Sequence, residues 1–445
     1  KRMSIYKDCD IRGVFGRELF ARDGHDVGRA LAALRPGGVF RVGGDVRLST
    51  PELKAALIEG LLAGGANVQD MGTIATPVLY WALKKPGADG GVMVTASHNP
   101  AQYNGLKFML GDRPVTRALI DRIEALVARG AFPEGAGRLE ALDVLPGYLG
   151  AMKARFGCAP RGKVVVDAGN GAMSLIAPEA LRACGYQVVE LFCTPDGAFP
   201  NRAPNPAEYG ELTALKALVV KERAAFGVAF DGDGDRAVFV DELGEVVVSE
   251  RALVVFIRHL LSGKPAPVVY DQKSSSVVKD AIRQMGGTPV AERSGHTFIK
   301  RRFLALGAAL AGEVSGHFFF GELGYDDGLF AALMMGEALS KAGTTLSQAL
   351  LNVVCPPITP DLRVFCAYAR QDALLAEVAQ AFEGHPITRM DGVRVETADG
   401  WLLVRKSVTA EQVTVRVEGR TFEALNELLK RVAAAAPELE ALSKA

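Results

Sequence analysis

The sequence lacks a charge imbalance, a cysteine framework and a long apolar run. Its 445 residues contain 51 Lys and Arg against 51 Asp and Glu, which argues against a dominant surface for nucleic acid or for an acidic partner. Six cysteines are scattered without metal-ligand spacing, so we expect reduced thiols. No apolar stretch reaches the ~20 residues of a membrane span, and the first residues resemble no secretory signal. These absences predict a soluble, cytoplasmic protein with no nucleic-acid or membrane partner.

Short apolar runs that end in glycine or small polar residues recur along the chain and alternate with helical patterns. Residues 38–45, 163–171 and 226–231 each read as a buried strand that leads into a loop. Residues 117–129 have the spacing of an amphipathic helix, and residues 329–342 are apolar on most sides and so predict a buried helix. Alternation of strands and helices is typical of a layered α/β architecture.

Two breaks divide this pattern. Residues 130–145 are rich in Gly, Ala and Pro, and prolines cluster at 356–360, which is typical of linkers. The length suggests three or four domains. We expect three similar mixed α/β domains followed by a smaller α+β domain, with boundaries at 1–146, 147–247, 248–355 and 356–445.

A candidate nucleophile lies at the end of one predicted strand. The run Gly91–Val94 leads through Thr95 and Ala96 to Ser97, and Pro100 disfavours helical geometry just after it. A serine exposed in such a turn is a candidate for covalent chemistry, although His98 beside it in sequence does not by itself activate it. An ordinary polar turn is the alternative.

Three carboxylates alternate with glycines at 231–235. Asp231, Asp233 and Asp235 would repel one another unless a cation or an arginine neutralised them. Oxygen ligands select hard ions, so Mg²⁺ is the expected metal. A calcium loop of the EF-hand kind is disfavoured, because Arg236 occupies its glycine position and because strands, not helices, flank the motif. A solvated acidic turn is the remaining alternative.

Other polar motifs are less specific. The tripeptide Ser-Gly-His occurs at 294–296 and at 315–317, with Lys300 and Glu313 close by in sequence; two histidines in glycine loops favour a functional role. Residues 405–409, Arg-Lys-Ser-Val-Thr, follow a predicted strand and offer hydroxyls, amides and a guanidinium for a phosphate.

Together the motifs resemble the α-D-phosphohexomutases, in particular the bacterial phosphomannomutase/phosphoglucomutase branch. The resemblance spans essentially the whole chain and rests on four motifs in the family's order: Asp10-Ile11-Arg12-Gly13, Thr95-Ala96-Ser97-His98-Asn99-Pro100, Asp231-Gly232-Asp233-Gly234-Asp235-Arg236 and Gly312-Glu313-Val314-Ser315-Gly316-His317. It implies four domains around a central cleft, which carry in turn the phosphoserine, the metal, the sugar-recognition loop and a phosphate-binding loop. It also implies a phosphosugar mutase, monomeric or a small homo-oligomer, that interconverts hexose 1-phosphate and hexose 6-phosphate of mannose or glucose.

The resemblance further assigns residues to roles. Ser97 would carry the phosphoryl group and, with Asp231, Asp233 and Asp235, would hold Mg²⁺. A hexose 1,6-bisphosphate would be intermediate and activator. The acid/base candidates would be Lys107, His317 and Arg12. Substrate would be bound by His98, Arg236, Lys273, His296, Glu313, Ser315, Arg405, Ser407 and Thr409.

Two positions depart from the family pattern. Cys9 stands where this branch usually has tyrosine, and Val408 stands where the last-domain loop usually has asparagine. A valine supplies no side-chain amide hydrogen bonds, so phosphate affinity or sugar preference is expected to differ. Phosphoglucosamine mutase is therefore an alternative. A metal-dependent sugar phosphatase and an inactive sugar-phosphate-binding protein are two further alternatives.

Overall fold

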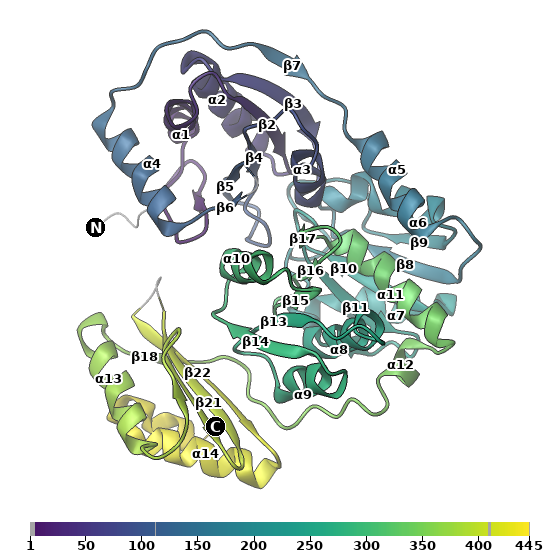
Figure 1. The fold of residues 1–445 in the computed structure, drawn as a ribbon, viewed down its shortest axis with the longest axis vertical. Helices are drawn as coiled ribbons and strands as arrows, with labels where there is room; N and C mark the ends of the chain where they lie inside the picture. Colours follow the sequence, from purple (N-terminus) through teal and green to yellow (C-terminus); the bar gives the residue numbers. More distant parts are fainter. Residues whose placement is uncertain (1–4, 112, 408–410, 445) are drawn as a thin grey trace.

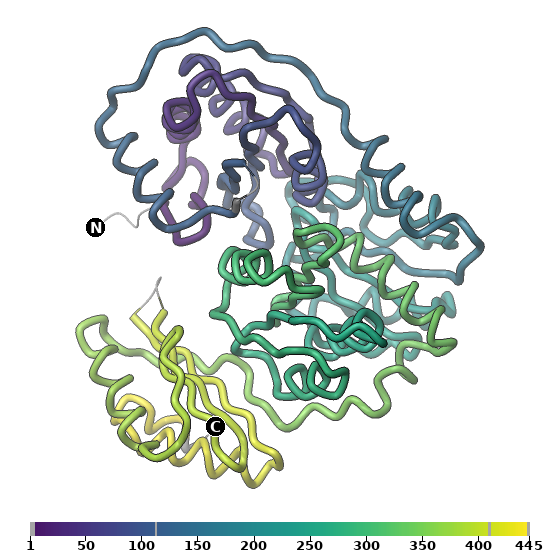
Figure 2. Tube along the Cα trace, viewed as in Figure 1, coloured from purple at the N-terminus to yellow at the C-terminus, as the bar shows by residue number. Residues whose placement is uncertain are grey.

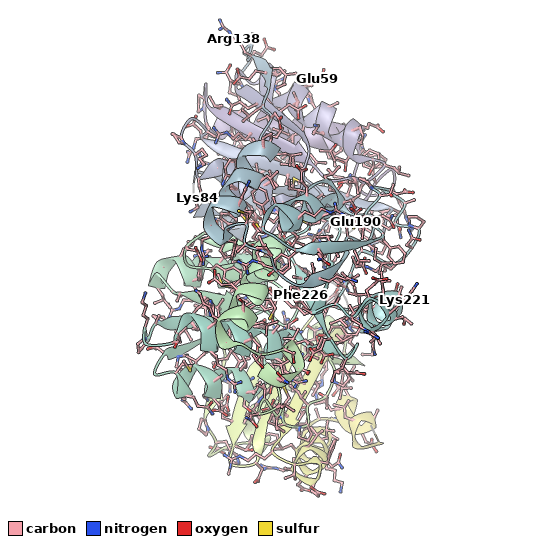
Figure 3. The ribbon with its side chains drawn as sticks, turned by 90° about the vertical axis from the view of Figure 1, so that its right-hand side faces the viewer. Glu59, Lys84, Arg138, Glu190, Lys221 and Phe226 are labelled. Carbon is pink, nitrogen blue, oxygen red and sulfur yellow. The ribbon has the colours of Figure 1, made fainter. Side chains whose placement is uncertain are left out.

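The computed structural model describes residues 5–111, 113–407 and 411–444. Four sheets follow one another along the chain, one for each domain. Domains I and IV lie at opposite ends of the long axis, with domains II and III side by side between them (Figures 1 and 3). In the described part of the chain, no helix is both long enough and apolar enough to cross a membrane.

Domain I is built on the sheet β1-β5-β4-β2-β3-β7, with β6 on β5. Helices α1 and α2 pack closely on one face, because Gly24, Gly28 and Gly60 leave no side chain between them. The bounds are β1 Ile11–Val14, α1 Ala21–Leu34, β2 Val39–Gly44, α2 Thr50–Ala63, β3 Asn67–Thr73, α3 Thr76–Leu83, β4 Gly90–Val94, β5 Tyr103–Leu110, β6 Arg113–Pro114, α4 Arg117–Arg129 and β7 Leu139–Ala141.

Domain II has the sheet β12-β11-β10-β8-β9. Its core is continuous with that of domain III and with α3 of domain I. The bounds are α5 Leu145–Phe156, β8 Lys163–Asp167, η1 Ala172–Leu175, α6 Ala177–Ala183, β9 Gln187–Leu191, η2 Tyr209–Leu212, α7 Thr213–Glu222, β10 Phe226–Phe230, β11 Ala237–Asp241 and β12 Val246–Val247.

Domain III has the sheet β14-β13-β15-β16-β17. The prediction that 329–342 forms a buried helix is confirmed by α11, whose residues from Gly328 to Leu339 are all buried. The bounds are α8 Ser249–Leu260, β13 Pro267–Asp271, α9 Ser276–Gln284, β14 Thr288–Glu292, α10 His296–Leu306, β15 Leu310–Gly312, β16 Phe318–Phe320, β17 Tyr325–Asp326, α11 Gly328–Ala342 and α12 Leu346–Ala349.

Domains I, II and III repeat one topology. Across each sheet, three parallel strands lie beside two further strands, each antiparallel to its neighbour. The orders are β3-β2-β4 then β5-β1, β9-β8-β10 then β11-β12, and β14-β13-β15 then β16-β17. The expectation of three similar α/β domains is thereby confirmed. The connection from the third parallel strand to its antiparallel neighbour occupies the same topological place in all three.

Domain IV is an antiparallel sheet, β18-β22-β21-β20-β19, with two helices packed over its own separate core. Figure 2 shows the chain that reaches it passing along domain III between α12 and β18. The expectation of a smaller α+β domain at the end of the chain is confirmed by this sheet and its helices. The bounds are β18 Leu362–Phe365, α13 Tyr368–Ala381, β19 Ile387–Thr388, β20 Val393–Thr397, β21 Gly400–Lys406, β22 Gln412–Gly419, α14 Phe422–Ala435 and η3 Pro437–Lys444.

Candidate active site

Ser97 lies in the turn between β4 and β5 and is 2% exposed. Its φ of 51° is left-handed, which a residue other than glycine adopts only when its surroundings impose it. The Ser97 N–H donates to Thr95 Oγ1 over 2.9 Å, and the Ser97 hydroxyl donates to Asp231 Oδ2 over 2.9 Å. The predicted nucleophile therefore reaches from domain I to the carboxylates of domain II.

The buried Arg47, which the sequence analysis did not single out, holds this turn. Its terminal nitrogens donate over 2.6–3.0 Å to four backbone carbonyl oxygens, those of Ser97, Asn99, Pro100 and Tyr103. Asp45 is its counter-ion, with Oδ2 3.1 Å from Arg47 Nε. A contact of this kind has no sequence signal, because it joins positions about fifty residues apart.

The three predicted metal ligands converge in the connection from β10 to β11. Asp231, Asp233 and Asp235 are fully buried, and their oxygens lie within 4.8 Å of one another. Asp231 Oδ1 accepts the backbone N–H groups of Gly234 and Arg236. Asp233 Oδ1 and Asp235 Oδ1 have no hydrogen-bond partner in the described chain. Buried carboxylate oxygens without donors are the ligands that a hard divalent cation such as Mg²⁺ takes, so the residues present fit this ion.

The charges of this cluster are strongly coupled. Burial, and then the negative charges of Asp233 and Asp235, raise the pKa of Asp231 to about 8. Burial alone would also raise the pKa of Asp235, but Lys107 and His317 outweigh it and lower that pKa. Lys107 Nζ, on β5, lies 2.7 Å from Asp233 Oδ2 and 2.6 Å from Asp235 Oδ2. Burial opposes the charge of Lys107, yet these carboxylates raise its pKa well above the usual value.

His317 is the last residue of the connection from β15 to β16, and Glu313 and Ser315 lie before it in the same connection. Arg236 Nε donates to His317 Nε2 over 2.9 Å, so the opposite nitrogen, Nδ1, carries the hydrogen and donates to Asp326 Oδ2 over 2.7 Å. Asp326 was not predicted. Glu313 Oε2 and Ser315 Oγ are buried and have no hydrogen-bond partner in the described ranges, so both are available for the polar groups of a ligand.

His296 begins α10 and does not lie in a glycine loop, which corrects the sequence interpretation. Gly295, at φ 123°, makes the bend that allows the helix to begin there. The His296 ring stacks on His317 with centroids 5.4 Å apart. Burial, together with Lys107 and His317, lowers the pKa of His296 to about 3, so it is neutral. Half-buried His98 follows Ser97, and burial lowers its pKa well below the usual value.

Arg12 is fixed against the turn that carries Ser97. On β1, it is bound by Asp10 and donates from Nη1 to Asn99 Oδ1 over 2.7 Å. Cys9 lies beside Thr297 of α10. Burial raises the pKa of the Cys9 thiol to about 11, so the thiol is neutral.

The predicted cleft residue Lys273 and the predicted phosphate-binding residues Arg405 and Ser407 come from other loops. Lys273, in the loop after β13, pairs with Asp361 of the linker. Arg405, at the end of β21, has Nη2 3.0 Å from Asp391 Oδ2. The Ser407 N–H donates to the carbonyl oxygen of Gln412. Thr409 and Val408 lie outside the described residues.

The three loops that form the cluster come from the same topological place in three repeated domains. Ser97 follows β4, the aspartates follow β10, and Glu313, Ser315 and His317 follow β15. In each domain this is the carboxyl end of a central parallel strand, where open α/β sheets bind ligands.

Four family models match consecutive parts of the chain. They are described as phosphoglucomutase/phosphomannomutase alpha/beta/alpha domains I, II and III and the C-terminal domain, and they match residues 4–134, 147–244, 249–354 and 363–435. The chain belongs to the phosphoglucomutase/phosphomannomutase family. The resemblance found in the sequence motifs is thus confirmed.

Relatives from this family align along nearly the whole chain. The phosphomannomutase/phosphoglucomutase of Pseudomonas aeruginosa is 37% identical over 434 residues, which cover 96% of this chain and 94% of the relative. The phosphoglucomutase of Neisseria gonorrhoeae is 36% identical over 439 residues, with coverage of 96% and 95%. Among solved structures, a phosphoglucomutase/phosphomannomutase family protein from Burkholderia thailandensis superposes with a TM-score of 0.91 at 34% identity, covering 98% of this chain and 97% of the other.

Proposed function

We propose that this chain is a phosphohexomutase that interconverts hexose 1-phosphate and hexose 6-phosphate, with mannose and glucose phosphates as substrates. The observation that carries the proposal is the hydrogen bond of 2.9 Å from the Ser97 hydroxyl to Asp231. It places the one strained serine of the domain I loop at a cluster of carboxylates suited to a divalent cation. Membership of a family of intramolecular phosphotransferases supports a role for Ser97 and Asp231 in phosphoryl transfer.

Ser97 is proposed as the carrier of the phosphoryl group. Asp231, Asp233 and Asp235 would hold Mg²⁺ together with the phosphorylated serine. When bound, this cation would offset the negative charge that accumulates around the phosphorus. The family is metal-dependent, and the unpartnered oxygens of Asp233 and Asp235 support the assignment of these ligands.

The chemistry is a transfer in both directions between Ser97 and the sugar. A free sugar hydroxyl attacks the phosphorus of phosphoserine, the bond from phosphorus to Ser97 Oγ breaks, and a hexose 1,6-bisphosphate forms. A base must take the hydroxyl proton as this happens. His317 Nε2 accepts a hydrogen bond in this structure, which supports it for that role, and Lys107 and Arg12 remain candidates for acid and base. The other phosphate of the bisphosphate then returns to Ser97.

Sugar and phosphate recognition are assigned to separate domains. Glu313 and Ser315 are proposed to bind sugar hydroxyls, with His98, His296 and Arg236 around them. Arg405, Ser407 and Thr409 are proposed to bind the phosphate that is not being transferred, and Lys273 is proposed to line the cleft. Since either end of the bisphosphate must occupy that site in turn, domain IV has to release and close again. Its separate core supports such movement.

A coupled assay on glucose 1-phosphate, mannose 1-phosphate and glucosamine 1-phosphate, with a hexose 1,6-bisphosphate as activator, tests the proposal. Product is expected from the first two substrates, and intact mass should show phosphate on Ser97 after incubation with the bisphosphate. Ser97→Ala should lose both signals. Ser347→Ala is the control, because it removes a serine-to-carboxylate hydrogen bond, to Glu242, far from the cluster. Release of inorganic phosphate without isomer would support a phosphatase, and a Ser97→Ala variant that remained active would refute the assignment.

A further inference from the structure

Arg47 is only 1% exposed, and most of its hydrogen-bond donors bind one short turn. Four carbonyl oxygens of residues 97–103 accept from its two terminal nitrogens. Its third side-chain nitrogen and its backbone N–H both donate to Asp45. Asp45 in turn accepts the hydroxyls of Thr50 and Thr95 over 2.8 and 2.7 Å. The planar guanidinium is the side chain whose rigid fork can serve several acceptors at once.

The turn that Arg47 holds is strained at the reacting residue. Ser97 has a left-handed φ of 51°, and a turn with that backbone relaxes unless its carbonyl groups are bound in place. Arg47 Nη2 donates to the carbonyl oxygen of Ser97 itself over 2.8 Å. The same carbonyl packs against Gly232, where a Cβ atom would come within 2.5 Å of it. The backbone of Ser97 is thus fixed between Arg47 and the carboxylate loop.

Arg47 also touches domain II directly. Its guanidinium carbon lies 5.1 Å from the ring centre of Phe199, in the long connection between β9 and η2. In the same connection, Gly197 packs so closely on the backbone of residues 46–48 that any side chain would clash. One buried residue therefore sets both the shape of the serine turn and its place against the domain that holds the aspartates.

We propose that Arg47 is a positioning residue for phosphoryl transfer, which holds Ser97 Oγ at the carboxylate cluster through the carbonyl oxygens of the turn. The inference rests on the proposed role of Ser97. A turn released from Arg47 keeps its serine but no longer holds the oxygen in line with the sugar hydroxyl. The phosphoserine is then hydrolysed more often: a water oxygen bonds to phosphorus, the bond from phosphorus to Ser97 Oγ breaks, and Ser97 Oγ takes a proton from the water.

Arg47→Lys tests the proposal, because it keeps the charge beside Asp45 but cannot serve four carbonyls. The matched control is Arg41→Lys. Arg41 is also buried, lies in the same domain and donates to three backbone carbonyls, those of Ala82, Lys85 and Pro86, away from the serine turn. Both variants are expected to melt at lower temperature than the wild type. Only Arg47→Lys is expected to lower kcat, by about 100-fold with KM little changed, as misplacement of a reacting group does.

The decisive measurement is the ratio of phosphoserine hydrolysis to mutase turnover, followed by intact mass and by released phosphate. The ratio should rise in Arg47→Lys and stay at the wild-type value in Arg41→Lys. Equal ratios in the two variants would overturn the proposal, as would a kcat unchanged in Arg47→Lys. If Arg47→Lys does not fold, Phe199→Leu provides the same comparison from the domain II side. A wild-type protein that never carries phosphate on Ser97 would instead refute the proposed function.

Discussion

Lys107 and Asp235 form a buried ion pair across two domains, with Lys107 Nζ 2.6 Å from Asp235 Oδ2. The same ammonium group lies 2.7 Å from Asp233 Oδ2. Domain I thus supplies the cation that neutralises two of the three carboxylates of domain II. This pair gives Lys107 an electrostatic task beside any role as an acid, and the two tasks can be separated by experiment.

Lys107→Met should destabilise the protein in the presence of EDTA, because it leaves two buried carboxylates without their cation, at a cost of about 3–5 kcal/mol. Magnesium should bind the variant more tightly than the wild type, since one competing positive charge is gone. Calorimetric melting with EDTA and with MgCl₂ measures both effects. Lys54→Met is the control, since Lys54 forms a less buried pair with Asp70 in the same domain. Equal melting of variant and wild type in EDTA would contradict the expected role of Lys107.

The loss of stability with rising pH should be confined to the metal-free protein. Asp231 has its pKa raised to about 8, so the metal-free fold keeps a proton that the unfolded chain gives up. Raising the pH from about 4 through about 8 therefore destabilises the metal-free protein. Magnesium requires the ionised form, so its affinity rises over the same window.

This linkage is measured as the difference in melting temperature between MgCl₂ and EDTA across that pH range. The difference should increase with pH in the wild type. In Asp231→Asn, which has no proton to release at that position, the increase should be much smaller. A wild-type difference that stayed constant with pH would show that metal binding releases no proton from the cluster.

Contiguous motifs made most of the cluster predictable. Asp231 and Glu313 directly follow a strand, and Ser97 and His317 lie a few residues after one; a strand that ends in a polar turn leaves a signal within that distance. The three repeated topologies then bring these turns together. By contrast, Arg47 binds carbonyl groups about fifty residues away in sequence, and Asp326 binds His317 only once the strands have packed. A single aspartate or arginine in the sequence does not reveal such a partner.

The last domain shows the limits of local patterns in another way. Buried and less buried residues alternate along β20 and through most of β22, whereas β18, a short edge strand with half its residues exposed, has a weaker apolar pattern. His296 was assigned to a loop because Gly295 precedes it, but a glycine with positive φ can equally start a helix.

His317→Asn should lower kcat while the protein folds normally. If His317 takes the proton of the sugar hydroxyl, its loss should cost about 10²–10⁴-fold in kcat, with a small change in KM. His259→Asn is the matched control, because His259 also pairs with a carboxylate, Glu337, in domain III over 3.0 Å. A coupled assay on both variants gives the comparison. Loss of less than about tenfold in His317→Asn would move the role of base to Lys107 or Arg12.

Arg405→Gln should weaken substrate binding more than it slows the chemistry. Arg405 is half-buried at the end of β21 and carries a Nε atom with no hydrogen-bond partner in the described chain. Its bonds to a phosphate would be charge-assisted and bidentate, so their loss should raise the dissociation constant by about 10–100-fold. Since this phosphate is not the one transferred, the interaction is made in ground state and transition state alike, and KM should change more than kcat.

Binding can be separated from chemistry by placing Arg405→Gln in the Ser97→Ala background and titrating glucose 6-phosphate by calorimetry. Arg370→Gln is the control, because Arg370 also pairs with carboxylates in domain IV, at Glu377 and Glu438. In the Ser97→Ala background, Arg370→Gln should bind glucose 6-phosphate with the same dissociation constant as Ser97→Ala alone. If Arg405→Gln bound glucose 6-phosphate as tightly as the control, the phosphate would have to be held by residues other than Arg405. Lys273, which pairs with Asp361 of the linker, would then be the next residue to replace.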